Sequence, residues 1–113
     1  MSPKRRRLPS TRNAAPIFAA LGDETRLQLV VRLSTGGPQS ISHLTAGSTV
    51  TRQAVTKHLE VLAAAGLASC ARRGRENVWE LERQPFDAAR HCLEGIAAQW
   101  DQALDRLRQF VED

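Results

Sequence analysis

The sequence is poor in the features that mark secreted and membrane proteins. Its 113 residues include only two cysteines, too few for a disulfide scaffold. No apolar run approaches the roughly 20 residues that a helix needs to cross a bilayer, and no apolar segment follows the basic N-terminus as it would in a secretion signal. We therefore expect a cytoplasmic protein in a reducing compartment, with no membrane partner.

The signatures of enzymes are also absent. The sequence contains no nucleophile elbow, no glycine-rich phosphate loop and no internal repeat. The histidines at positions 43, 58 and 91 fall on three separate predicted helices. We therefore expect no enzyme activity, no catalytic residue and no cofactor or metal.

Basic residues are concentrated in the N-terminal part of the chain. The net charge is +4, but residues 1–83 hold 13 Lys or Arg against 6 Asp or Glu, whereas residues 84–113 hold 3 against 6. The two ends are therefore expected to meet different partners. We interpret residues 1–12 as a disordered basic arm and residues 13–113 as the folded domain. The run at residues 4–7 (KRRR) is expected to add nonspecific affinity for phosphates, although such runs also serve as nuclear-localisation signals.

Hydrophobic periodicity and turn residues divide the domain into helices and strands. We expect helices over residues 14–21, 24–34, 43–46, 51–65 and 86–111, and strands over 67–73 and 77–81. Ser42 is expected to cap the short third helix. A short helix, a glycine-containing turn, a longer helix and then a hairpin predict a winged helix-turn-helix domain, mainly α with a small β-hairpin.

The fourth predicted helix has one apolar and one polar face. Val55, Leu59 and Leu62 fall together as a core stripe. Arginine can bond guanine and glutamine can bond adenine in the major groove, and threonine and lysine can bond phosphates or base edges. The pattern favours a recognition helix that contacts DNA, and the alternative is an ordinary solvated face. The predicted DNA-binding residues of this helix are Thr51, Arg52, Gln53, Thr56 and Lys57.

The predicted hairpin carries three arginines around its turn: Arg72, Arg73 and Arg75. Gly74 can adopt the positive φ that a tight hairpin turn requires. Guanidinium groups at a hairpin tip suit phosphates or a narrow minor groove, so we predict that this wing binds DNA. The alternative is a hairpin tip whose charge prevents edge-to-edge pairing.

The last predicted helix carries an apolar stripe with heptad-like spacing over nearly four heptads. A domain of this size could hardly cover such a stripe, so a partner helix is expected. A homodimer formed through the first and last helices would place two recognition helices on two half-sites about one DNA turn apart. The alternative is a helix packed only on its own domain. The predicted dimerisation residues are Phe86, Leu93, Ile96, Trp100, Leu104 and Leu107.

Several of these segments resemble the ArsR/SmtB family of winged helix-turn-helix repressors. Residues 21–27 (LGDETRL) resemble the opening of the family's second helix, and residues 51–59 (TRQAVTKHL) look like its recognition helix. The entry into the family's wing is similar to residues 62–67 (LAAAGL). The wing itself is similar to residues 73–76 (RGRE), followed by Trp79. The resemblance implies a homodimer that binds inverted repeats of double-stranded DNA in promoters and blocks transcription.

The sequence departs from the metal-sensing members of that family. Residues 42–45 (SHLT) lack the cysteine pair that those members carry in the third helix, and their zinc-binding Asp/His pairs on the last helix are not matched. Asp87, His91 and Glu94 share a helical face by spacing, which makes a metal site conceivable, but a solvated i,i+4 pair is commoner.

Cys70 and Cys92 are the other candidate trigger, for a redox or thiol-reactive switch. Neither has a histidine or a second cysteine at ligand spacing, and free cysteines are more often buried and inert. We expect a regulator with no inducer or with an unrecognised one. The alternative function is a winged-helix protein-interaction module with only nonspecific DNA affinity.

Overall fold

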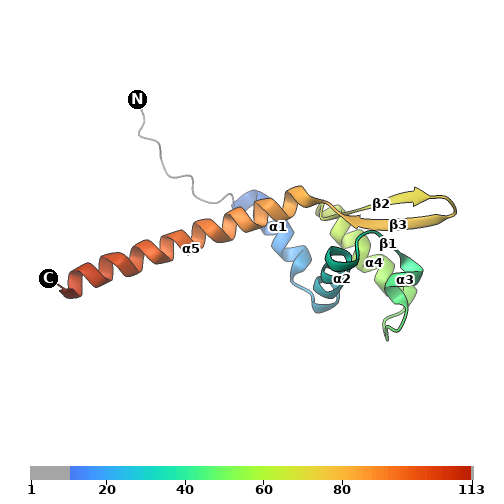
Figure 1. The fold of residues 1–113 in the computed structure, drawn as a ribbon, viewed down its shortest axis with the longest axis horizontal. Helices are drawn as coiled ribbons and strands as arrows, with labels where there is room; N and C mark the ends of the chain where they lie inside the picture. The colour runs from blue at the N-terminus through green and yellow to red at the C-terminus, as the bar shows by residue number, and fades with distance from the viewer. Residues whose placement is uncertain (1–10, 113) are drawn as a thin grey trace, which may run out of the picture.

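A computed structural model describes residues 11–112 (Figure 1). The prediction of a mainly helical winged helix-turn-helix fold with a small β-hairpin is confirmed. The elements, in chain order, are α1 (Thr11–Leu21), α2 (Glu24–Gly36), β1 (Gln39–Ser40), α3 (Ile41–Thr45), α4 (Arg52–Ala64), β2 (Ala68–Arg73), β3 (Glu76–Leu81) and α5 (Arg83–Glu112).

Helix α1 begins at Thr11, three residues before the predicted start. It therefore takes in Thr11 and Arg12, the last two residues of the predicted basic arm. The rest of that arm, residues 1–10 with the basic run at 4–7, lies outside the described residues.

Helix α3 is capped by Ser40, and the prediction of Ser42 as its cap is wrong. Ser40 has extended backbone angles, and its hydroxyl oxygen accepts a hydrogen bond from the His43 N–H at 3.2 Å. The physical reason is the sheet: Ser40 pairs with Val78 of β3, which keeps the chain extended up to the first helical residue. Ser42 consequently lies in the first turn of α3, with its side chain exposed.

The three strands form one antiparallel sheet in the order β1-β3-β2. Strands β2 and β3 form the wing, and their register pairs Arg73 with Glu76 across a turn of two residues, Gly74 and Arg75. Gly74 has a φ of +64°, and no residue other than glycine among residues 11–112 has a positive φ. A positive φ at the first central residue alone is the pattern of a type II′ turn, which matches the twist of the flanking strands.

The core lies between α4 and the elements around it. Val55, Leu59 and Leu62 are buried on the inner face of α4, as predicted, and Leu59 and Leu62 are fully inaccessible to solvent. They join Leu44 of α3, Leu67 and several residues of α1 and α2 in one cluster. Because one face of α4 is fixed against this core, its opposite face points to solvent.

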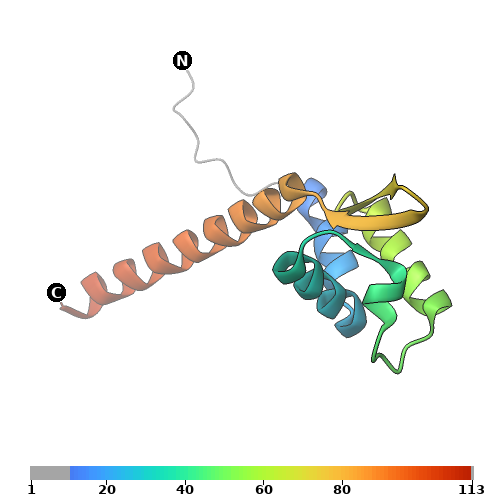
Figure 2. The ribbon, with the colours of Figure 1, turned by 45° about the vertical axis from the view of Figure 1, so that its right-hand side comes forward.

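Helix α5 projects away from the rest of the molecule (Figures 1 and 2). The radius of gyration is 19.2 Å, against about 13 Å for a compact domain of this length. Only the first part of α5 packs against the chain, with Ala89 and Cys92 buried, and no residue between Cys92 and Glu112 is buried. No helix in the described part of the chain is long and apolar enough to cross a membrane.

Candidate nucleic-acid interface

The outward face of α4 presents three long polar side chains to solvent: Arg52, Gln53 and Lys57. The two predicted threonines serve the helix itself. Thr51 is the N-cap, and its hydroxyl oxygen accepts a hydrogen bond from the Ala54 N–H at 3.1 Å. The Thr56 hydroxyl donates to the backbone carbonyl of Arg52 at 2.9 Å. The groups most available to a DNA partner are therefore the guanidinium, the amide and the ammonium.

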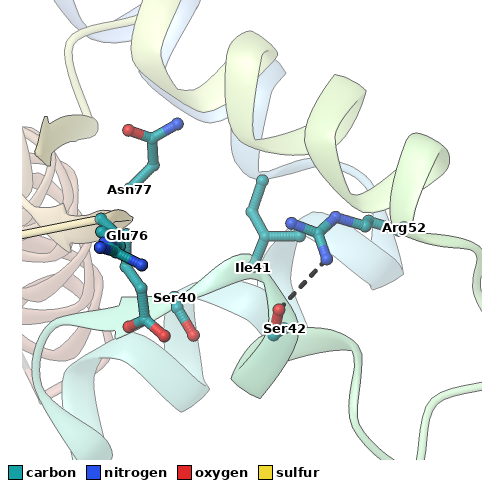
Figure 3. A pocket seen from close by; sticks show the side chains of 7 residues that line it. Ser40, Ile41, Ser42, Arg52, Glu76 and Asn77 are labelled. Atoms are coloured by element: carbon teal, nitrogen blue, oxygen red, sulfur yellow. Dashed lines mark hydrogen bonds between the residues drawn. The ribbon is translucent and has the colours of Figure 1, made fainter.

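Arg52 also connects the two helices of the helix-turn-helix. Its Nη1 atom donates a hydrogen bond to the hydroxyl oxygen of Ser42 on α3 at 3.1 Å (Figure 3). This bond draws the guanidinium toward α3.

The three wing arginines are all exposed but differ in their contacts. Nε of Arg72 donates to the Gly74 carbonyl at 3.3 Å, and Arg73 lies 3.9 Å from the Glu80 carboxylate on the neighbouring strand. Within residues 11–112, Arg75 forms neither an ion pair nor a side-chain hydrogen bond. Arg75 is thus the wing cation most available to an external anion.

The helix-turn-helix and the wing meet at a pocket of about 160 Å³. Four parts of the fold contribute to it: the end of β1, the start of α3, the first residue of α4, and the wing turn with the start of β3 (Figure 3). The structure therefore brings Arg52 and Arg75 together, whereas Arg72 and Arg73 lie outside the pocket lining. Its lining residues are Ser40, Ile41, Ser42, Arg52, Arg75, Glu76 and Asn77.

Five of the six predicted dimerisation residues form an exposed apolar stripe on α5. Leu93, Ile96, Trp100, Leu104 and Leu107 are between 47% and 67% exposed. The sixth, Phe86, is half-buried and packs against the core of its own chain. The stripe continues to Phe110 and Val111 at the end of the helix.

Sequence comparison finds related transcriptional regulators. The chain is 37% identical over 80 residues to the uncharacterized HTH-type transcriptional regulator YuzN of Bacillus subtilis, covering 66% of this chain and 87% of that protein. It is 33% identical over 95 residues to the HTH-type transcriptional regulator Rv2034 of Mycobacterium tuberculosis, covering 84% of this chain and 85% of that protein. No protein-family model matches the chain.

Solved structures of the same fold include an ArsR-like transcriptional regulator from Rhodococcus sp. RHA1. The two chains superpose with a TM-score of 0.77 and 36% sequence identity, over 89% of this chain and 94% of the other. The chain belongs to the ArsR-like family of helix-turn-helix transcriptional regulators. The prediction that it is not an enzyme is confirmed, because these relatives are transcriptional regulators.

Behind the outward face of α4, a cluster of side chains connects this helix to α1 and α2. Nη1 of Arg26, on α2, lies 3.4 Å from Nδ1 of His58, on α4. Arg26 also donates from Nε to the Ala20 carbonyl at the end of α1 at 2.6 Å. His58 is thus bound within its own domain, and Arg26 connects three helices.

Asp23 completes this cluster as the N-cap of α2. Its carboxylate accepts a hydrogen bond from the Arg26 N–H at 3.0 Å and lies 3.8 Å from the His58 ring. The backbone hydrogen bond from Arg26 is the main reason that the pKa of the Asp23 carboxyl is lower than its ordinary value of 3.8. A carboxyl with a lowered pKa stabilises the fold above its unfolded-state pKa, and this contribution is lost as the pH falls through the folded-state pKa.

Replacing Asp23 by asparagine tests this contribution. Asp23→Asn keeps an oxygen that can accept from the Arg26 N–H but loses the charge, so we expect a lower Tm than that of the wild type near neutral pH. The difference should shrink as the pH falls below 3.8, because the wild-type carboxyl then becomes protonated. Thermal unfolding followed by circular dichroism measures both proteins, and a difference that is constant with pH would contradict the charge effect.

A second set of hydrogen bonds stabilises the helix-turn-helix and was not predicted from the sequence. The guanidinium of Arg32, on α2, donates to the backbone carbonyls of Leu44 and His43 at the end of α3, the latter at 3.0 Å. A short helix leaves its last carbonyls with few helical partners. Arg32 supplies a donor to Leu44 and a second donor to His43, whose carbonyl also accepts from the Ala46 N–H at 3.3 Å.

The structure places the residues considered for a metal site or a thiol switch. Among residues 11–112, no three His, Cys, Asp or Glu side chains are grouped so that they could hold a metal ion. Asp87 and Glu94, from the face considered for a metal site, each lie 3.5 Å from the Arg90 guanidinium instead. Cys70 is exposed on β2 and Cys92 is buried on α5, and both are free thiols.

Proposed function

We propose that this regulator represses transcription by binding an inverted-repeat operator in double-stranded DNA as a homodimer in the cytoplasm. The observation that carries the proposal is the outward face of α4, where Arg52, Gln53 and Lys57 are exposed opposite a fully buried stripe. A recognition helix held in this way can enter the major groove with its N-terminal residues foremost.

The wing supports the same mode of binding. Arg72, Arg73 and Arg75 are exposed around a tight turn, and guanidinium groups there can bind phosphates or enter the minor groove beside the recognition helix. The proposed DNA contacts are therefore Gln53 and Lys57 with base edges or phosphates, Arg52 at the helix start, and the wing arginines with the backbone. Thr51 and Thr56 shape the start of the helix.

The apolar stripe of α5 supports the homodimer. It runs from Leu93 to Val111 on a helix of 30 residues, and at 1.5 Å per residue this part of the helix is about 28 Å long. Exposed apolar stripes of this length are unfavourable in water and are covered by partners. A second copy of α5 offers the same stripe, so the two helices can cover each other in a two-fold arrangement. A dimer bound across a promoter represses simply by excluding other proteins from the DNA.

Selection of random double-stranded DNA by the purified protein tests the proposal. We expect an inverted repeat with half-sites about one turn apart to be enriched, and its affinity to fall steeply with salt because phosphates are contacted. If no sequence is enriched and the weak remaining binding disappears on deletion of residues 1–12, the protein is an interaction module and the proposal is wrong.

Gln53→Ala is expected to relax the base preference at one position in each half-site, at a cost of roughly 1–3 kcal/mol in binding free energy. The amide is exposed at the second residue of α4 and can bond adenine bidentately. Titration of the enriched duplex and of its single-base variants measures the effect. Gln109→Ala, the same substitution at an exposed position near the end of α5, is the control and should leave both affinity and preference unchanged.

A further inference from the structure

The pocket between the helix-turn-helix and the wing combines two cations with neutral donors. Arg52 and Arg75 enter it from different elements, and Glu76 contributes the single carboxylate, so the lining carries a net charge of +1. Neither arginine pairs with an acidic side chain within residues 11–112. Two guanidinium groups that share a pocket repel each other, and an anion bound between them offsets this repulsion.

The neutral groups of the lining can also donate hydrogen bonds. The hydroxyl oxygen of Ser40 accepts from the His43 N–H, and that of Ser42 accepts from Arg52. Each hydroxyl keeps its own O–H as a donor. The amide of Asn77 adds two N–H donors at the opposite side of the pocket (Figure 3). The anion that suits this set has several oxygen acceptors.

The size of the pocket favours a small group over a whole ligand. Its volume of about 160 Å³ accommodates a tetrahedral phosphate, but it is below the roughly 300–1,000 Å³ typical of pockets for drug-sized molecules. The pocket is also adjacent to the proposed reading face, because Arg52 and Gln53 are consecutive residues of α4.

The side chain of Arg52 points in a direction that gives it a different role from Gln53. Its hydrogen bond to Ser42 turns the guanidinium toward α3 and into the pocket (Figure 3). A guanidinium has five N–H donors, so four remain for an anion after this bond. Its planar fork fits two oxygens of a phosphate.

We propose that Arg52 and Arg75 together hold one phosphodiester of the DNA backbone in this pocket in each half-site. Arg52 then fixes the register of α4 on the duplex, while Gln53 beside it reads the base. This assignment rests on the proposed function, which it refines by giving two consecutive residues different roles.

Removing the charge of Glu76 is expected to strengthen DNA binding, whereas removing an arginine of the pocket is expected to weaken it. Its carboxylate lies on the Ser40 side of the pocket (Figure 3), where it repels a bound phosphate. Glu76→Gln is therefore expected to strengthen operator binding about fivefold per half-site, the effect of one like-charge contact in water. A gain of affinity cannot arise from misfolding. Glu112→Gln makes the same charge change at the far end of α5 and should leave affinity unchanged.

Arg52→Ala is expected to weaken binding about 10- to 100-fold and to reduce the salt dependence by about one charge per half-site. The ratio of affinities for the enriched duplex and its single-base variants should stay the same, whereas Gln53→Ala changes that ratio. The deciding probe is the enriched duplex in which one phosphate at a time is replaced by an uncharged methylphosphonate. One position in each half-site should weaken the wild type about tenfold and weaken Arg52→Ala less, because only Arg75 then faces that phosphate. The same replacement should leave the affinity of the double variant Arg52→Ala/Arg75→Ala unchanged.

The outcomes separate this assignment from the proposed function. If the duplex is enriched and Gln53 reads it, but no methylphosphonate position distinguishes the wild type from Arg52→Ala, the phosphate assignment alone is wrong. A change of base preference in Arg52→Ala would make Arg52 a base reader and also overturn it. Inorganic phosphate can also be added at constant ionic strength. If it competes with the duplex for the protein while no methylphosphonate position weakens binding, the pocket binds free phosphate and the assignment to the DNA backbone is wrong. If no duplex is enriched, the proposed function fails first and this assignment with it.

Discussion

Trp100→Glu is expected to convert the regulator into a monomer and to lower its operator affinity by about 100-fold or more, the gain that two linked half-sites provide. Trp100 lies in the middle of the exposed stripe of α5 and is 67% exposed. In the proposed dimer it is covered by the partner helix, where a glutamate would bury a charge without a partner. Two such charges, one from each subunit, would also repel each other.

The measurement is the mass in solution, by sedimentation or light scattering, together with operator titration. Because Trp100 makes no contribution to the core of its own chain, circular dichroism should show an unchanged helix content. Gln109→Glu adds the same charge on the opposite face of α5 and serves as the control. A Trp100→Glu protein that remains a dimer with full affinity would show that the stripe is not the dimer interface.

Leu59→Ala is expected to lower the free energy of unfolding by about 2–5 kcal/mol, because it leaves a cavity in a packed core. Leu59 is fully buried on the inner face of α4, within the cluster that connects α4 to α2 and the wing. A loss of this size corresponds to a fall in Tm of about 10 °C or more in a domain of this length.

Urea unfolding at one fixed protein concentration measures the loss, since a dimer's stability depends on concentration. Leu27→Ala is the matched control. Leu27 lies on α2 and is 48% exposed, so the same deletion should cost much less. Equal losses for the two variants would contradict the assignment of α4 as the centre of the core.

The sequence predicted the features that depend on periodicity and on turn residues. The stripe of Val55, Leu59 and Leu62 was predicted to be buried and is buried. The hairpin turn at Gly74 follows from a glycine between two β-rich segments, and the structure gives that residue the required positive φ. The five helices follow in the predicted order, with ends that shift by a few residues.

The contacts that orient the recognition helix could not be predicted in this way. Arg32 donates to backbone carbonyls 11 and 12 residues away, and every residue has a carbonyl, so no residue type marks the partner. The two serines at 40 and 42 are equally good caps by composition, and only the pairing of β1 with β3 decides between them. The pocket joins Arg52 to wing residues more than 20 positions later, a proximity that only the fold creates.

The projecting part of α5, beyond Cys92, has a consequence for how such regulators diversify. Its side chains are not buried in their own chain, so they can change without unfolding the body that carries α4 and the wing. In the proposed dimer, the choice of partner and the choice of operator therefore depend on separate residues. A cell with several regulators of this kind can keep their subunits from mixing through substitutions in α5 alone, while each recognition helix retains its own DNA sequence.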